Sequence, residues 1–317
     1  SKQKLPNSRK CSRRYSTTVA SVRSGSVIET RRRICSRPDC EWPLLRNLPV
    51  DTPERMTPVF DFCAGAAPIL ISVPHDGREL APGQADRLTS YAKTLPDTDW
   101  HVRRLYDFAD DLGANVLAAE YSRYVVDLNR PADDSALYEG QVSTGVCPSA
   151  LFDGSPIYSA ECVTADEVGD RIETYWRPYH ARLRQALDEL VERHGQVVLW
   201  DAHSIASRVP RLFEGELPAL NLGTNGGGSC HPDVEAATWR AASATGYTAV
   251  LNGRFRGGFI TRHYGDPKRG IHAIQLEVAQ THYMDEVSFA WDADNAPRLA
   301  AAIREMMAAA LSAVSKI

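Results

Sequence analysis

Short apolar runs that lead into reactive polar side chains recur along this sequence. Residues 68–73 (PILISV) precede His75, and residues 196–200 (QVVLW) run directly into Asp201 and His203. Short, nearly continuous apolar runs are typical of strands that are buried on both faces of a sheet. We therefore interpret both runs as buried strands that end at side chains able to do chemistry.

The same arrangement occurs twice more. Residues 123–128 (RYVVDL), which we interpret as a strand, precede Asn129 and Arg130, and the run 272–278 (HAIQLEV) carries Glu277 near its end. In open α/β sheets, ligands bind beyond the carboxyl ends of the strands. We expect the polar groups of all four runs to meet in a single site.

Segments with helical spacing alternate with these strands. The clearest, 166–194, contains Pro178, which we expect to kink or split it because proline lacks the helical hydrogen-bond donor. We expect Asn295 to cap a later Ala-rich helix. The alternation predicts a single-domain α/β fold with a mostly parallel, mixed central sheet flanked by helices. The remaining predicted elements are helices 102–112, 232–245 and 295–314 and strands 114–119 and 247–251.

Two segments do not fit this alternation. Residues 131–160 are rich in Pro, Gly, Ser and Asp. They predict a long ordered loop, and long loops in compact domains are often functional.

Residues 1–55 differ sharply in charge from the rest of the chain. They contain 13 Lys/Arg against 5 Asp/Glu, a balance of +8, whereas the remainder has 23 against 35, a balance of −12. Such Arg- and Ser-rich segments are typical of transit peptides. The alternative, which we favour, is a segment upstream of a true start at Met56. Either way we expect 1–55 to be disordered, because it cannot bury enough apolar surface, and 56–317 to form the domain.

Composition narrows the class of partner. The acidic body carries all nine His residues, which is not the profile of a nucleic-acid-binding protein. No apolar run approaches the length of about 18 residues that a transmembrane helix needs. The seven Cys are widely spaced, which is typical of a reducing compartment. We expect a cytoplasmic protein with a small-molecule substrate; the oligomeric state is not readable.

Two imidazoles, those of His75 and His203, are candidate metal ligands. Asp201 lies two residues before His203, on the same side of an extended strand, and could bind the same ion or orient the imidazole. Glu79 lies four residues after His75 and could reach the same point if the turn between them is helical. With either carboxylate, the set would make a three-ligand zinc site that leaves one position for water.

Glu277 is the candidate general base for amide hydrolysis at such a metal. That reaction needs a group that takes a proton from water and passes it to the leaving nitrogen. A carboxylate within an apolar strand is costly unless it has a partner or a function. A metal site with an adjacent base therefore predicts a hydrolase.

Two further groups are candidate substrate clamps. Arg130, beside the amide of Asn129, suits a carboxylate, which arginine binds in a bidentate manner. Arg262 and Tyr264 follow the pair Gly257–Gly258, where the missing side chains allow close approach of the backbone. Two arginine clamps suit a dicarboxylate.

Several strings of residues resemble the N-formylglutamate amidohydrolase family. The resemblance extends from about Met56 to at least Asp285. The strings are VPHDG, DTDWHVRRLYDFA, EYSRYVVDLNRPADD, FDGSPIY, DAHSI, NLGTNGGGSC, NGRFRGGFITRHYG and QLEVAQTHYM.

The resemblance implies an activity. It implies zinc-dependent hydrolysis of N-formyl-L-glutamate to formate and L-glutamate, the last step of one route of histidine degradation. The alternatives are a related zinc hydrolase of another N-acyl amino acid or small peptide, and a metal-free protein that binds an acidic ligand.

The site is also distantly similar to that of the zinc acylases and desuccinylases of the carboxypeptidase-like fold. This similarity implies zinc ligands at His75 and His203, a carboxylate clamp at Asn129 and Arg130, and a general base at Glu277.

One departure concerns the third ligand. In that group, a glutamate follows the first histidine by three positions. Here Arg78 stands at that position and the acid follows as Glu79. The third ligand is therefore open between Glu79 and Asp201.

Overall fold

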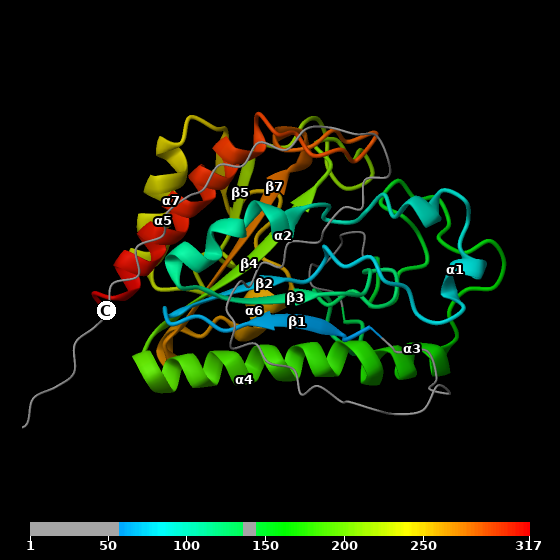
Figure 1. Ribbon diagram of the computed structural model, residues 1–317, viewed down its shortest axis with the longest axis horizontal. Coiled ribbons are helices and arrows are strands. Elements are labelled where there is room, and N and C mark those ends of the chain that lie inside the picture. Colours follow the sequence, from blue (N-terminus) through cyan, green and yellow to red (C-terminus); the bar gives the residue numbers. More distant parts are fainter. Residues whose placement is uncertain (1–56, 136–143) are drawn as a thin grey trace, which may run out of the picture. The chain divides into compact units, whose positions relative to one another are not determined.

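Seven strands form one mixed sheet in the computed structural model, which describes residues 57–135 and 144–317 (Figure 1). The strand order is β1-β3-β2-β4-β7-β5-β6, and four of the six neighbouring pairs are parallel. Only β1 against β3 and β5 against β7 are antiparallel. The strands are β1 (Phe60–Cys63), β2 (Ile69–Val73), β3 (Asn115–Ala119), β4 (Val197–Ile205), β5 (Leu220–Gly223), β6 (Ala249–Leu251) and β7 (Ile271–Ala279).

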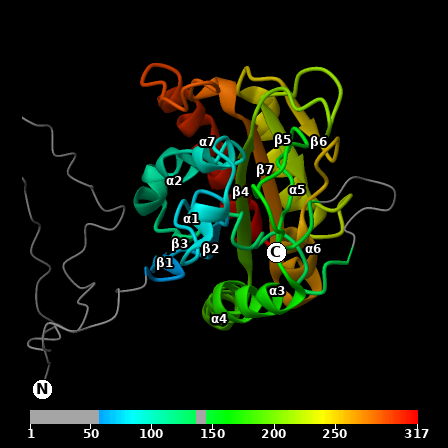
Figure 2. The same ribbon diagram turned by 90° about the vertical axis from the view of Figure 1, so that its right-hand side faces the viewer.

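Helices cover both faces of this sheet. Figure 1 shows α4 along one face and α2, α5 and α7 on the other, and the turned view in Figure 2 shows the same two layers. This is the predicted α/β architecture, a mixed and mostly parallel sheet flanked by helices. The helices are α1 (Gln84–Arg87), α2 (Val102–Leu105), α3 (Ala165–Arg171), α4 (Arg177–His194), α5 (Pro232–Ala244), α6 (Phe259–Tyr264) and α7 (Ala296–Val314).

The apolar stripe of α4 anchors one of these layers. Tyr179, Leu183 and Leu187 recur at intervals of four residues and pack in the same core cluster as Leu70 of β2 and Leu199 of β4. All nine residues of β4 are buried, because helices lie on both sides of it. This double burial explains why the central strands are nearly continuous apolar runs in the sequence.

The predicted split of the long helix is confirmed. One π-helical turn, Ile172–Trp176, separates α3 from α4, and Pro178 lies in the first turn of α4. The backbone stays helical through this turn, where the amide of Arg177 donates to the carbonyl of Ile172, and the change in hydrogen-bond pattern occurs just before Pro178, which has no amide hydrogen. The oxygen of Thr164, which accepts from the amide of Glu167, caps the start of α3.

The predicted strand over 123–128 is wrong. This segment forms turns, and side chains together with local backbone contacts, rather than a neighbouring strand, satisfy its backbone groups. The Nη1 atom of Arg171 donates to the carbonyls of Tyr124 and Val125, at 3.1 Å each. An apolar and β-branched run therefore folds as a loop because a buried guanidinium replaces the strand ladder.

Smaller differences concern ends and edges. The predicted helix 102–112 is broken into α2 and a 3-10 turn at Asp107–Leu112. Asn295 precedes α7 but does not cap it, because its side chain donates to Asp292. Strands β1 and β5 were not predicted; both are short. The expected disorder of 1–55 and the middle of the expected loop 131–160 lie outside the described residues.

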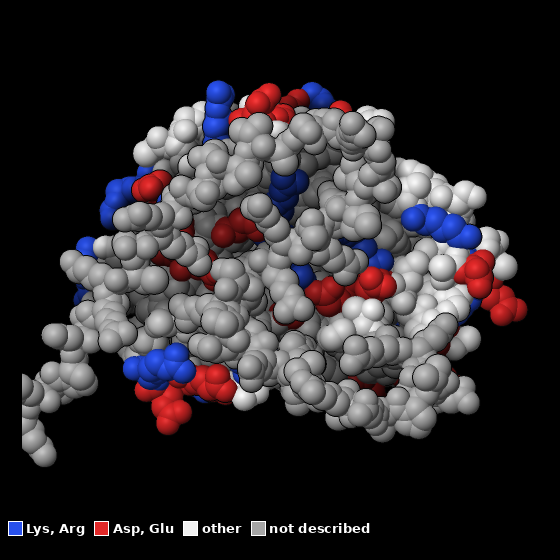
Figure 3. Space-filling view, in the orientation of Figure 1, with Lys and Arg blue, Asp and Glu red and all other residues white. Residues whose placement is uncertain are grey.

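Surface charge and helix composition concern the expectation that the protein acts on a small molecule and binds neither nucleic acid nor a membrane. Acidic and basic side chains lie interspersed where they are visible in Figure 3. No helix in the described ranges is both long and apolar enough to cross a bilayer.

Candidate metal centre and active site

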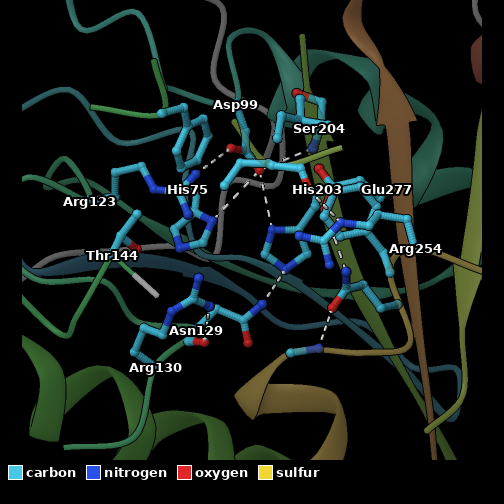
Figure 4. A pocket seen from close by; sticks show the side chains of 16 residues that line it. His75, Asp99, Arg123, Asn129, Arg130, Thr144, His203, Ser204, Arg254 and Glu277 are labelled. Carbon is cyan, nitrogen blue, oxygen red and sulfur yellow. Dashed lines mark hydrogen bonds and ion pairs between the residues drawn. The ribbon is translucent and has the colours of Figure 1, made fainter. Parts of the chain in front are cut away.

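The predicted site residues of the central strands converge at one edge of the sheet. Strands β2, β4 and β7 are parallel neighbours, so their carboxyl ends lie together. His75 follows β2 by two residues. His203 on β4 is the register partner of Glu277 on β7, which places an imidazole beside a carboxylate on adjacent strands. All three side chains line one pocket (Figure 4).

A third residue, Asp99, joins the two imidazoles. Its Oδ2 lies 3.7 Å from Nδ1 of His75 and 3.2 Å from Nδ1 of His203. The two rings are 4.9 Å apart between centroids, and all three side chains are buried. One potential ligand atom from each residue lies within 4.8 Å of the others. His75, Asp99 and His203 could therefore bind a metal ion together.

The outer nitrogen of each imidazole faces a second carboxylate. Nε2 of His75 lies 2.8 Å from Oδ1 of Asp127, and Nε2 of His203 lies 3.1 Å from Oδ1 of Asp201. The first of these contacts is a hydrogen bond, and metal-binding histidines usually donate their other N–H in this way, which fixes the tautomer and the orientation of the ring. Both Nδ1 atoms are thereby directed at Asp99.

The surroundings fit a divalent cation. Nδ1 of His75 is buried and has no hydrogen-bond partner, so it is a nitrogen that a metal would satisfy. The buried carboxylates around the two rings outnumber the buried guanidinium of Arg123. Two nitrogens and one carboxylate oxygen are also a ligand set that zinc accepts. The carboxylates are Asp99, Asp127, Asp201 and Glu277.

Three groups contact the carboxylate of Asp99: the imidazole of His203, a backbone amide and a guanidinium. The backbone amide of Ser204 donates to Oδ2 at 3.0 Å, and Nη1 of Arg123 donates to Oδ1 at 3.3 Å. Burial raises the pKa of Asp99, but the contacts with His203 and His75 and the charge of Arg123 outweigh it and hold that pKa below its ordinary value. Asp99 is therefore an anion with a fixed orientation, as a metal ligand must be.

The same negative surroundings shift the other two groups. Burial lowers the pKa of His203, but Asp201 and Asp99 outweigh it, so the pKa lies well above the ordinary value. A divalent cation competes with that proton for Nδ1. Burial is the main cause that raises the pKa of Glu277, to about 8, and the nearby carboxylates add to it. Such a carboxyl can both accept and release a proton near neutral pH.

Asn129 is locked into the pocket wall by the backbone of α6. The amide of Ile260 donates to Oδ1 of Asn129 at 2.8 Å, which turns Nδ2 toward Nε2 of His203, 3.1 Å away. A Cβ on Gly258 would stand 2.3 Å from that Nδ2, so only glycine leaves room for the amide. The close approach expected at the double glycine is therefore present, and its partner is Asn129.

The other predicted residues divide into two groups. Arg130 lines the pocket. Arg262 does not, and its Nε donates to the carbonyl of Gly257 at 2.7 Å. Tyr264 is buried with its hydroxyl 2.9 Å from Nδ1 of His180, away from the pocket lining.

The two carboxylates considered for the third ligand position also differ from expectation. Glu79 is exposed and its backbone pairs with Tyr121, because the turn after His75 is extended rather than helical. Asp201 faces the outer nitrogen of His203 and accepts from Thr261. The structure places Asp99 between the imidazoles instead.

Sequence reasoning missed several residues of this pocket. Asp99 lies in a loop before α2, where an acid resembles an ordinary helix-start residue, although it belongs to the string DTDWHVRRLYDFA. Arg123 lies in the misread strand. Gln275 could have been predicted, because it lies two residues before Glu277 and therefore on the same face of β7. Its Nε2 lies 3.4 Å from Oε2 of Glu277. Arg254 lies in the string that suggested Arg262.

The family model for N-formylglutamate amidohydrolase matches residues 67–284, which include every residue of this pocket. The chain belongs to the N-formylglutamate amidohydrolase family. It is 50% identical over 260 residues to an N-formylglutamate deformylase of Pseudomonas putida, a match that covers 81% of this chain and 97% of the relative. The same identity and coverage hold for an N-formylglutamate deformylase of Pseudomonas aeruginosa.

Solved structures bear out the fold. An N-formylglutamate amidohydrolase from Ralstonia eutropha superposes with a TM-score of 0.69 at 24% identity, covering 81% of this chain and 98% of that one. A gene product of Agrobacterium tumefaciens superposes with a TM-score of 0.63 at 17% identity, covering 80% and 95%. At such identities the likeness concerns the fold alone. The expected resemblance to carboxypeptidases stays a prediction.

Proposed function

We propose that this protein is an amidohydrolase that converts N-formyl-L-glutamate and water to formate and L-glutamate. One observation carries the proposal. The buried His75–Asp99–His203 group and Glu277 lie in one pocket, inside a stretch that is half identical to N-formylglutamate deformylases. The alternative of a metal-free binding protein is disfavoured, because the buried carboxylates around the two imidazoles outnumber the buried guanidinium of Arg123 and because Nδ1 of His75 would have no partner.

His75, Asp99 and His203 would hold the metal, which we propose to be zinc. When bound, the ion lowers the pKa of a water molecule and polarises the carbonyl of the substrate. Three protein ligands leave a coordination position for that chemistry. Asp127 would keep the ring of His75 oriented by a hydrogen bond to its outer nitrogen, and Asp201 would act on the outer nitrogen of His203 through its charge, 3.1 Å away.

Glu277 would be the general base and then the general acid. It accepts a proton from the attacking water and delivers it to the amide nitrogen as the bond to the formyl carbon breaks. Its raised pKa suits both steps. Gln275 donates toward Oε2 of Glu277, which limits the rotation of the carboxylate.

Asn129 and Arg130 would bind a carboxylate of the substrate next to the scissile amide. Both line the pocket, and Nη1 of Arg130 donates to the backbone carbonyl of Asn129 at 3.1 Å, which restrains the guanidinium. A restrained fork of donors matches a carboxylate better than a mobile ammonium does.

The test is a substrate panel that measures release of L-glutamate from every derivative and of formate from the formyl derivative. The purified protein is stripped with a chelator, restored with zinc or another divalent ion, and offered N-formyl, N-acetyl and N-succinyl derivatives of L-glutamate. We expect metal-dependent turnover with a preference for the formyl derivative. Absence of formate release with every metal, or better turnover of N-succinylglutamate, would contradict the proposal.

A further inference from the structure

Three arginines line the pocket among the residues that the structure describes. Arg123 is committed to the metal-binding group, because its guanidinium donates to Asp99 and, at 3.0 Å, to Asp127. The other two are Arg130 and Arg254, both half-buried. In Figure 4 they lie on opposite sides of the two imidazoles. Two further guanidinium groups therefore line the pocket, one on each side of the imidazoles.

The loop that carries Arg254 is fixed to the sheet. Asn252 follows β6 with a positive φ of 52°, and its side-chain oxygen accepts from the amides of Thr224 and Gly226. These bonds tie the end of β6 to the end of β5. Nε of Arg254 then donates to the carbonyl of Leu212 at 2.8 Å. The position of the Arg254 guanidinium is therefore restrained by the anchored turn at Asn252 and by the carbonyl of Leu212.

The wall beside Arg254 is apolar. Leu212 and Phe255 line the pocket with it and pack on the core cluster that contains Ile205. Arg130, in contrast, stands beside the polar amide of Asn129. An apolar wall that ends in a guanidinium matches a short methylene arm that ends in a carboxylate.

We propose that Arg254 binds the side-chain carboxylate of the substrate, while Arg130 with Asn129 binds the carboxylate next to the scissile amide. This inference rests on the proposed function and adds to it the residue that selects an acidic side chain. It also replaces Arg262, which does not line the pocket.

The test compares two substrates of nearly equal size, N-formyl-L-glutamate and N-formyl-L-glutamine. Arg254→Gln should lower kcat/KM for the glutamate substrate about 10- to 100-fold, through a higher KM. The kcat/KM for the glutamine substrate should change by less than about threefold. The difference arises because only the glutamate substrate loses a charge-assisted pair. Arg254→Lys keeps the charge but not the fork, so its loss should be intermediate.

Two arginines of the same loop region serve as controls. Arg256→Ala removes an exposed side chain and should leave both substrates unaffected. Arg262→Ala removes a bond within the loop, so any loss should be equal on the two substrates. Equal losses with Arg254→Gln would overturn the inference, as would a substrate preference that switches with Arg262→Ala instead.

The wild-type protein separates the two proposals. If it releases formate from N-formylglutamate but the Arg254 variants keep the wild-type substrate ratio, the function stands and the assignment of Arg254 falls. If the wild type fails on N-formylglutamate, both fall. Melting temperatures within a few degrees of the wild type show that the variants are folded, and the substrate ratio is independent of the folded fraction.

Discussion

Nε2 of His75 lies 2.8 Å from Oδ1 of Asp127, and this hydrogen bond leaves Nδ1 as the ring nitrogen that is directed at Asp99. Oδ1 of Asp127 also accepts from the backbone amide of Asn129, and its Oδ2 accepts from Arg123. The carboxylate is therefore immobile, and with it the ring. Nδ1 of His75, the nitrogen directed at Asp99, is therefore oriented by a contact on the opposite side of the ring.

Asp127→Asn should weaken metal binding without abolishing it. The amide keeps the shape but not the charge, and loss of such an outer partner typically costs about 10- to 100-fold in metal affinity. Competition with a chromophoric chelator measures the affinity. Asp294→Asn, at an exposed acid remote from the pocket lining, is the control and should bind metal as the wild type does. Unchanged affinity in Asp127→Asn would show that this carboxylate does not orient the ligand.

The third ligand can be identified by comparing three carboxylates. Asp99→Asn should lose most of the bound metal, because it removes the anion between the two imidazoles. Asp201→Asn should lose about 10- to 100-fold in affinity, as an outer partner does. Glu79→Gln should keep full affinity, since this side chain is exposed. Metal content after dialysis gives the ranking, and a larger loss in Glu79→Gln than in Asp99→Asn would reverse the assignment.

Glu277→Gln should separate binding from chemistry. The amide is similar in size but cannot take a proton, and a general base contributes roughly 10²- to 10⁴-fold in rate. We expect bound metal and KM close to the wild type and a kcat reduced by about that factor. Single-turnover formate release measures it. A loss below about tenfold would leave Glu277 with a structural role only.

Gly258→Ala should disturb the active site through packing alone. The added Cβ would overlap the side chain of Asn129, and overpacking of this kind typically costs about 1–3 kcal/mol. Thermal unfolding and KM should both change. Gly169→Ala in α3 is the matched control: a Cβ there meets nothing within 4 Å, and replacing a helical glycine should stabilise by about 0.5–1 kcal/mol. Equal effects at the two glycines would contradict the close contact.

His180 should contribute to acid sensitivity. Burial of the ring beside α6 lowers its pKa to about 3, and the charge of His263 adds to this, whereas the hydrogen bond to the carbonyl of Leu128 acts in the opposite direction. Below the ordinary pKa of 6.5 the unfolded chain binds a proton that the folded chain refuses until about pH 3. The stability contribution is therefore complete above 6.5 and is lost as the pH falls through that window.

The variant His180→Gln removes this titration and keeps an amide donor for Leu128. Denaturant unfolding at about pH 7.5 and about pH 4.5, with a chelator present, should give a stability loss that is smaller than in the wild type by roughly 2 kcal/mol. Parallel pH profiles would exclude His180 as a source of the acid sensitivity.

The sequence predicted the central strands β2, β4 and β7 well and did not predict β1 and β5, for a physical reason. β2, β4 and β7 are buried on both faces, so their apolar runs are unmistakable, and their polar residues stand out. β1 and β5 are short, with little pattern to detect. The run 123–128 has strand composition, yet Arg171 supplies its hydrogen bonds. A hydrogen-bond donor that is distant in the sequence cannot be detected in the local pattern of residues.

The candidate site shows the same limit. His75, His203 and Glu277 were predicted from the strands that carry them, and the structure brings them together. Asp99 and Arg254 lie in loops, and their position depends on contacts with remote segments, such as the amide of Ser204 and the carbonyl of Leu212. Spacing from His75 made Glu79 one of two candidates for the third ligand, but the turn after His75 carries that side chain outward.

The place of β7 in the sheet has a consequence for biosynthesis. It is the last strand in the chain, yet it lies between β4 and β5, and it alone joins the pair β5–β6 to the remaining strands. A nascent chain that has not yet released β7 from the ribosome would expose two open strand edges, which are templates for wrong pairing. The strand that delivers Glu277 also closes the sheet, so the polypeptide acquires its protection from aggregation and its proposed base in the same late step.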